Sequence, residues 1–171
     1  MTTDWDLVAR KFGTDKSSSF HDYMGDYEVL LGHRPVTRLL ELGVSHGSSL
    51  FMWREIFPEA LIVGVDNEDH CRLHQRVGIA VIIADMANPA QMAAVSKLHG
   101  PFDVIIDDGS HVPSDTVSAF EELYPVMARD GLYVVEDYPP DDPFTHAFAE
   151  QWNGQILDGK TGSLIAVQRH Q

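Results

Sequence analysis

The chain contains 171 residues, 44% of them hydrophobic, which is the length of one domain with a core of its own. Its 26 acidic residues outnumber its 12 lysines and arginines, and the formal charge of -14 argues against a nucleic-acid or anionic-membrane partner. The chain has one cysteine, its start does not have the basic and apolar pattern of a signal peptide, and its apolar runs are too short to cross a bilayer. These features argue against a secreted or membrane-spanning chain, so we expect a cytoplasmic protein.

The predicted elements divide the chain into a short leading part and one main domain. Residues 1–35 are polar with a helical pattern, and we expect a helical lid or appendage there. From residue 36 onward, apolar runs rich in β-branched residues alternate with helical patterns. The runs predict parallel strands at 36–42, 60–65, 79–83, 102–106 and 132–135. The patterns between them predict helices at 48–57, 69–77, 88–98 and 114–128.

The end of the chain has a different pattern. Segments 155–157 and 163–168 are strand-like, and the polar turn 158–162 joins them. This spacing predicts an antiparallel hairpin that closes one edge of the sheet. Together the elements predict an α/β domain over residues 36–171, with an open, mostly parallel sheet and right-handed crossovers.

A glycine-containing turn follows the first predicted strand. Gly43 and Gly47 stand in it before the helix at 48–57, and glycines there let the backbone approach a ligand closely. Their spacing differs from the Gly-x-Gly-x-x-Gly of dinucleotide dehydrogenases, which disfavours a nicotinamide-dependent oxidoreductase. Glu41 precedes the turn, where a carboxylate repels a pyrophosphate but suits an amino group. Ser45, within the turn, could bond a ligand carboxylate.

Acids also follow the next two predicted strands. Asp66 ends the second strand, where a carboxylate can accept both hydroxyls of a ribose. Asp85 follows the third, close to the expected place of an adenine edge, and Met86 beside it could pack on the adenine or on the core. A ligand with an ammonium, a ribose and an adenine but no phosphate is S-adenosylmethionine. The alternative interpretation is a tight turn with two solvated acids.

Two acidic pairs end the fourth and fifth predicted strands. Asp107 and Asp108 follow the fourth, and Glu136 and Asp137 follow the fifth. If these strands are neighbours, about 4.8 Å apart, their acids crowd together and need protons or a metal ion to neutralise them. Carboxylate oxygens suit Mg²⁺ and tolerate Mn²⁺. We therefore predict Asp108, Glu136 and Asp137 as metal ligands and Asp107 as a cofactor contact. The alternative for each acid is a solvated loop position.

A histidine three residues beyond Asp108 is the candidate catalytic base. His111 is close enough in sequence to serve the same site without being a ligand. A histidine with an ordinary pKa of about 6.5 is a usable base near neutral pH. We therefore predict that His111 takes a proton from the substrate.

Three residues of the leading part have open roles. Lys16 could meet the cofactor's carboxylate, although a surface position is the default expectation for a lysine. Tyr23 and Tyr27 lie four residues apart and share one face of a helix. From that face they would cover the cofactor, touch a sugar or pack as part of a lid.

Several of these motifs together resemble a known family. They are the Glu-Leu-Gly-x-x-x-Gly turn at 41–47, the acid Asp66, and the strings Asp-Asp-Gly-Ser-His at 107–111 and Val-Val-Glu-Asp at 134–137. This set resembles the metal-dependent sugar O-methyltransferases of macrolide antibiotic tailoring. The string Phe-Gly-Thr-Asp-Lys at 12–16 resembles the family's stretch ahead of the core.

The resemblance implies both a fold and a site. The fold is the Rossmann-like class I methyltransferase fold, a seven-stranded sheet of order 3-2-1-4-5-7-6 whose last strand is antiparallel. The site has Mg²⁺ at the positions that match Asp108, Glu136 and Asp137, with a general base at the position that matches His111. The implied substrates are S-adenosylmethionine and a small molecule that accepts the methyl group on a hydroxyl, and the expected acceptor is a sugar or a glycosylated natural product.

Two other functions remain open from the sequence. The chain could methylate an aromatic diol with the same metal chemistry, which an apolar, aromatic-lined acceptor pocket would favour. It could also be a cofactor-binding module without catalysis, which cofactor binding without a metal site would favour. A homo-oligomer is possible on general grounds.

Overall fold

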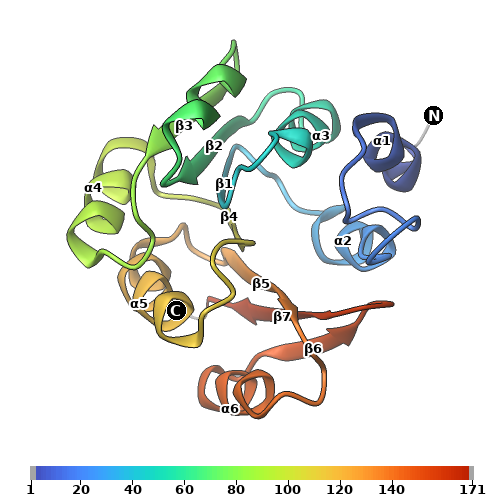
Figure 1. Ribbon diagram of the computed structural model, residues 1–171, viewed down its shortest axis with the longest axis vertical. Helices are drawn as coiled ribbons and strands as arrows, with labels where there is room; N and C mark the ends of the chain where they lie inside the picture. Colours follow the sequence, from blue (N-terminus) through green and yellow to red (C-terminus); the bar gives the residue numbers. More distant parts are fainter. Residues whose placement is uncertain (1–2, 170–171) are drawn as a thin grey trace.

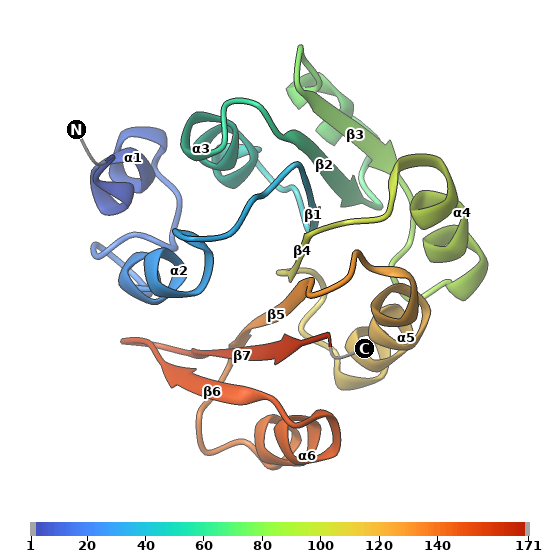
Figure 2. The same ribbon diagram turned by 180° about the vertical axis from the view of Figure 1, so that it is seen from behind.

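The computed structural model describes residues 3–169, which form a sheet with helices on both of its faces (Figures 1 and 2). Its strands, in chain order, are β1 (Arg38–Leu42), β2 (Leu61–Asp66), β3 (Ile79–Ile83), β4 (Val104–Asp107), β5 (Leu132–Tyr138), β6 (Gln155–Asp158) and β7 (Ser163–Gln168). They pair in the order β3-β2-β1-β4-β5-β7-β6. Strands β1 to β5 are parallel, and β7 runs antiparallel to both β5 and β6. The predicted fold class and strand order are confirmed.

The helices cover the sheet in two groups of three. The first group is α1 (Trp5–Phe12), α2 (Met24–Leu31) and α3 (Ser48–Ile56), and the second is α4 (Pro89–His99), α5 (Pro113–Leu123) and α6 (Pro143–Trp152). Each group buries its apolar side on one face of the sheet, so that the central strands are covered on both sides. This burial explains why the central strands are nearly continuous apolar runs.

Two predicted helices are shorter in the structure than in the sequence analysis. The segment expected to be helical at 69–77 is a 3₁₀ helix over Asp69–His74, because Cys71 is its only buried residue and a longer helix would have no apolar side to bury. The helix expected at 114–128 ends at Leu123 and continues as a 3₁₀ turn over Tyr124–Val126. Pro125 in that turn has no N–H to extend the α-helix.

The leading residues pack into the same core as the main domain. Trp5 of α1 meets Trp53 of α3 edge to face, with ring centroids 6.5 Å apart. Tyr27 of α2 meets the same Trp53 ring at 5.0 Å. These aromatic pairs attach α1 and α2 to the sheet through α3. A separate lid in residues 1–35 stays a prediction.

The acids predicted to act in the site lie at the carboxyl ends of the parallel strands. Successive side chains of a strand point to opposite faces, so acids that are adjacent in the sequence lie on opposite faces of the sheet. Glu41 and Glu136 face the helices α1–α3, whereas Asp107 faces α5 and α6. Within residues 3–169, no helix combines the length and the apolar character that a membrane span requires.

Candidate active site

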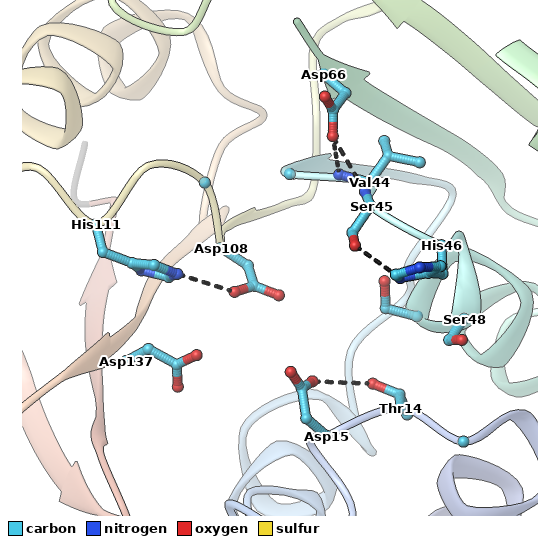
Figure 3. Close-up of a pocket in the computed structure, with 14 residues that line it drawn as sticks. Thr14, Asp15, Val44, Ser45, His46, Ser48, Asp66, Asp108, His111 and Asp137 are labelled. Carbon is cyan, nitrogen blue, oxygen red and sulfur yellow. Dashed lines mark hydrogen bonds and ion pairs between the residues drawn. The ribbon is translucent and has the colours of Figure 1, made fainter. Parts of the chain in front are cut away.

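Two adjoining cavities open at the carboxyl ends of the central strands. The larger has a volume of about 380 Å³ and lies among the loops after α1, β1 and β4 and the end of β5 (Figure 3). The smaller, of about 200 Å³, lies over the ends of β2 and β3. Gly43, Asp66 and Gly109 line both, so the two cavities form a continuous cleft. This is the place where open α/β sheets bind their ligands.

The turn after β1 forms the centre of the cleft. Gly43 has a φ of 93°, and a Cβ at this position would lie 1.9 Å from the carbonyl oxygen of Asp108. The turn therefore packs against the loop after β4 without room for a side chain. Ser45 lines the cavity with a φ of 46°, and Gly47 forms the N-cap of α3.

Asp66, at the end of β2, holds this turn in place. Its Oδ2 accepts hydrogen bonds from the backbone N–H groups of Val44 at 2.8 Å and Ser45 at 3.1 Å, and its Oδ1 accepts one from Glu68 at 2.9 Å. Burial raises the pKa of Asp66, but these hydrogen bonds outweigh it and place the pKa below its ordinary value. Asp66 is therefore a carboxylate that lines both halves of the cleft.

The smaller cavity contains the residues that were assigned to the adenine. Asp85 and Met86 both line it. The Met86 sulfur accepts a hydrogen bond from the Ser110 N–H at 3.4 Å and lies where a Cβ on Gly109 would clash, at 2.2 Å. The thioether therefore contacts the loop after β4 and presents an apolar surface to this cavity.

Asp108, His111 and Asp137 come together at the larger cavity. One potential ligand atom from each lies within 4.8 Å of the others, and His111 Nε2 lies 3.8 Å from Asp108 Oδ1. Figure 3 shows the three side chains facing a common space. His111 and Asp137 have positive φ angles of 53° and 68°, and Asp137 occupies a bulge in β5. The bulge re-aims the Asp137 side chain relative to the regular strand.

A buried lysine lies behind this cluster. Lys16 Nζ contacts Asp108 Oδ2 at 2.5 Å, Glu136 Oε2 at 2.7 Å and Glu41 Oε1 at 3.5 Å, and its side chain has no exposed surface. Tyr27 completes the arrangement by donating its hydroxyl hydrogen to Glu136 Oε1. The expectation of a surface lysine is wrong, because carboxylates collected on one buried face need a cation beside them.

The charges in this cage support one another. Burial lowers the pKa of Lys16, but the carboxylates of Asp108, Glu136 and Glu41 outweigh this effect. The pKa therefore lies well above its ordinary value, and the amine stays protonated. Burial raises the pKa of Glu136, and the Lys16 ammonium opposes that rise. Burial also raises the pKa of Glu41 to about 7, against the same ammonium. Removing the ammonium would therefore leave the carboxylates without compensation.

Asp137 is held from the opposite side by the leading part of the chain. Its Oδ1 accepts a hydrogen bond from the Tyr23 hydroxyl at 2.7 Å, and His21 Nδ1 lies 3.5 Å from the same oxygen. The rings of His21 and Tyr23 are stacked, with centroids 5.1 Å apart. Both tyrosines, Tyr23 and Tyr27, thus contact acids of the site, one each.

Three predicted cofactor contacts lie outside the linings of the two cavities: Glu41, Gly47 and Asp107. Glu41 is fully buried, and its oxygens face the Ser49 hydroxyl at 2.8 Å and the Trp53 N–H at 3.4 Å as well as Lys16. Asp107 faces the other side of the sheet, where it accepts the Tyr133 hydroxyl at 3.3 Å. Burial raises the pKa of Asp107 to about 7. Their contact with a cofactor stays a prediction that these positions do not favour.

The site also contains residues that the sequence analysis did not single out. Thr14 and Asp15 line the larger cavity from the loop after α1. Lys16, which follows them, was weighed only as a surface residue or a cofactor contact. The signal in the sequence was the Phe-Gly-Thr-Asp-Lys string, whose polar residues stand in a turn between two helices.

Replacing Gly43 by alanine should damage both the turn and the site. The new Cβ would push on the Asp108 carbonyl, and φ of 93° is strained for alanine. We expect Gly43→Ala to lower the free energy of unfolding by about 2 kcal/mol or more in a urea titration. Gly25→Ala is the control, because a Cβ on Gly25 meets nothing within 4 Å. Equal stability of the two variants would contradict this account of the turn.

The sheet order and the cleft define a class I methyltransferase fold, and comparisons with known proteins agree. A family profile described as a methyltransferase domain matches residues 40–138. The 8-demethyl-8-alpha-L-rhamnosyl tetracenomycin-C 2'-O-methyltransferase of Streptomyces olivaceus is 37% identical over 140 residues, 76% of this chain and 36% of that protein. The L-olivosyl-oleandolide 3-O-methyltransferase of Streptomyces antibioticus is 36% identical over 145 residues, 80% of this chain and 37% of that protein.

The solved structures show the same fold. The MycE methyltransferase from the mycinamycin biosynthetic pathway, in complex with Mg, SAH and mycinamycin VI, superposes with a TM-score of 0.85 at 24% identity. The match covers 98% of this chain and 55% of that one.

The chain belongs to the methyltransferase-domain family whose profile matches residues 40–138, and its resemblance to the sugar O-methyltransferases is confirmed. It spans little more than a third of the length of the two relatives named above.

Proposed function

We propose that this chain is an S-adenosylmethionine-dependent, Mg²⁺-dependent O-methyltransferase that acts on a sugar hydroxyl of a glycosylated small molecule. The observation that carries the proposal is the cluster of Asp108, His111 and Asp137 beside the glycine turn, within one cavity. The two relatives described above are named as O-methyltransferases of a rhamnosyl tetracenomycin and of an olivosyl oleandolide.

The cleft fits the parts of S-adenosylmethionine in the order the sequence predicts. The smaller cavity, with Asp85 and Met86, is the place for adenine, and Asp66 at the junction is the place for the ribose hydroxyls. Gly43 and Ser45 border the larger cavity, which would hold the methionine part. When bound, S-adenosylmethionine supplies the methyl group.

The acid cluster fits a divalent cation by the chemistry of its donors. Asp108 and Asp137 each present carboxylate oxygens to the space they share with His111, and hard oxygens are the ligands that Mg²⁺ prefers. Glu136, the third predicted ligand, is not part of this cluster; it contacts the Lys16 ammonium, which also contacts Asp108. When bound, Mg²⁺ supplies Lewis-acid stabilisation of the acceptor oxygen.

In the reaction, His111 would accept the proton of the acceptor hydroxyl at a ring nitrogen. Asp108 lies 3.8 Å from Nε2 and stabilises the imidazolium that results. The new bond joins the acceptor oxygen to the methyl carbon, and the bond from that carbon to sulfur breaks. Asp108 and Asp137 hold the acceptor side of the cavity, and the glycine turn holds the methyl-donor side, so much of the rate gain would come from positioning.

The polarity of the cavity favours a sugar over an aromatic diol. Its lining consists of Gly, Thr, Asp, Ser and His residues with one valine, Val44. Sugar hydroxyls can form hydrogen bonds with such a surface, whereas an aromatic ring gains little from it.

Metal removal tests the proposal directly. With S-adenosylmethionine and rhamnosyl or olivosyl glycosides as acceptors, we expect methyl transfer by mass spectrometry that stops in EDTA and returns with Mg²⁺. Asp108→Asn should lower turnover about 100-fold or more at any Mg²⁺ concentration. Full activity in EDTA would contradict the metal, and cofactor binding without transfer to any sugar would favour the non-catalytic module.

A further inference from the structure

The loop between α1 and α2 brings a carboxylate into the larger cavity. Thr14 and Asp15 form one wall of this cavity, and Ser45 and Ser48 lie on another. Figure 3 shows the Asp15 side chain pointing into the space between Asp137 and Thr14. Its Oδ1 accepts a hydrogen bond from the Thr14 hydroxyl at 3.4 Å. Asp15 is therefore accessible to a ligand in the cavity.

The other acids that line this cavity are already engaged. Asp66 accepts three backbone hydrogen bonds, Asp108 contacts the Lys16 ammonium, and Asp137 accepts the Tyr23 hydroxyl. Among the hydrogen bonds and ion pairs of residues 3–169, the Asp15 carboxylate has only that neighbouring hydroxyl. It is the lining acid best placed to take a new cationic partner.

Glu41, the acid that the sequence favoured for an amino group, does not reach the cavity. It has no exposed surface, and it contacts Ser49, Trp53 and Lys16 instead. A ligand ammonium would have to displace the Lys16 ammonium to bind it. The cationic end of a ligand in this cavity is therefore left to Asp15.

The wall formed by the start of α3 suits an anion. Helix α3 begins at Ser48, and its N-cap, Gly47, supplies no side-chain hydrogen bond to the first N–H groups. Uncapped N–H groups and the positive end of a helix favour a carboxylate. An acid on one wall and a helix N-terminus on another match the two charges of an amino acid.

We propose that Asp15 binds the α-ammonium of the methionine part of S-adenosylmethionine, while the N-terminus of α3 receives its α-carboxylate. This inference rests on the proposed function and assigns a cofactor-binding residue to the leading part of the chain. The segment before residue 36 then recognises the methyl donor and does more than cover it.

Two ligands separate the amino-acid part from the nucleoside part. S-adenosylhomocysteine carries the ammonium and the carboxylate, whereas 5'-deoxy-5'-methylthioadenosine keeps the adenosine and the sulfur without them. We expect Asp15→Asn to weaken S-adenosylhomocysteine about tenfold or more in calorimetry, because a charge-assisted hydrogen bond is lost. Its affinity for 5'-deoxy-5'-methylthioadenosine should change less than about twofold.

Asp22→Asn is the matched control. Asp22 belongs to the same loop, contacts Lys160 at 3.0 Å, and has a φ of 67° that asparagine tolerates. This variant makes the same change of charge outside the cavity, and both affinities should stay at the level of the unmodified protein. Thermal midpoints of the two variants show whether either change disturbs the fold.

The outcomes distinguish this inference from the proposed function. A selective loss for S-adenosylhomocysteine in Asp15→Asn supports the inference. Unchanged binding of both ligands, or equal losses for both, overturns it while the proposed function stands. If the unmodified protein binds neither ligand, the proposed function and the inference fail together.

Discussion

Replacing His111 by alanine should abolish most of the turnover and leave the binding of S-adenosylhomocysteine within about twofold of its original value. His111 lies at the acid cluster and not in the smaller cavity, so its loss removes a proton acceptor without removing a nucleoside contact. General-base catalysis contributes about 100- to 10,000-fold, and we expect a fall in kcat of that size.

The measurement is kcat and KM for methyl transfer, with cofactor affinity by calorimetry on the same protein. His146→Ala is a suitable control, because His146 is an exposed residue of α6 outside the two cavities. A His111→Ala protein with near-normal kcat would rule out the base assigned here. A variant that loses cofactor affinity as much as kcat would indicate a structural role for this histidine instead.

Replacing Lys16 by methionine should produce the largest loss of stability. The side chain is fully buried and contacts three carboxylates, so methionine would fill the space but leave those charges unpaired. Breaking a buried ion pair from one side costs about 3–5 kcal/mol of unfolding free energy. Urea titration of both proteins in EDTA measures this difference without a contribution from bound metal ions.

The pH dependence of this stability loss distinguishes a loss of charge compensation from a loss of packing. Burial raises the folded-state pKa of Glu41 and of Glu136 above their ordinary values, so each group favours the fold at low pH and opposes it as the pH rises. The unfolding free energy that Lys16→Met loses should therefore become smaller as the pH falls from about 8 to about 6. A deficit that is independent of pH would mean that packing, and not charge, is lost.

An exposed lysine provides the comparison for this variant. Lys11 contacts Glu55 at 2.5 Å, but both side chains are substantially exposed, and surface pairs contribute about 0–1 kcal/mol. Lys11→Met should therefore cost little. If the two variants lose the same stability, the buried cage has no special part in holding the fold.

Local patterns in the sequence predicted the strands and helices, and the family resemblance implied the strand order. Runs such as 60–65 and 102–106 alternate with helical patterns, and Pro89 and Asn88 mark the start of α4 as predicted. The boundaries that differed, at 69–77 and 114–128, depend on how much of a segment the core buries. That quantity is a property of the folded chain and not of a local pattern.

The site was harder to predict than the fold. The ends of β4 and β5 were correctly placed beside each other, so the meeting of their acids could be inferred. Successive side chains of extended chain point to opposite faces, so the adjacent Asp107 and Asp108 face Tyr133 and Lys16 respectively, and their shared place at a strand end does not bring both into the site. The bulge at Asp137 interrupts the alternation and has no clear mark in the sequence.

The partner of these acids could not be read from the sequence at all. Lys16 is separated by 92 residues from Asp108 and by 120 from Glu136, and their contact arises only when α1 and α2 pack on the sheet. A lysine in a polar turn is usually exposed. The family string at 12–16 marked the turn, but not the side chain that enters the core.

A crystal structure of the protein with S-adenosylhomocysteine and Mn²⁺ tests the central claim most directly, since anomalous scattering locates the ion without assumptions about its ligands. We predict a single strong peak within coordination distance, about 2.0–2.4 Å, of carboxylate oxygens of Asp108 and Asp137, in the cavity that holds the amino-acid end of the nucleoside. An ion bound elsewhere, or a nucleoside bound with no ion at those carboxylates, would contradict it.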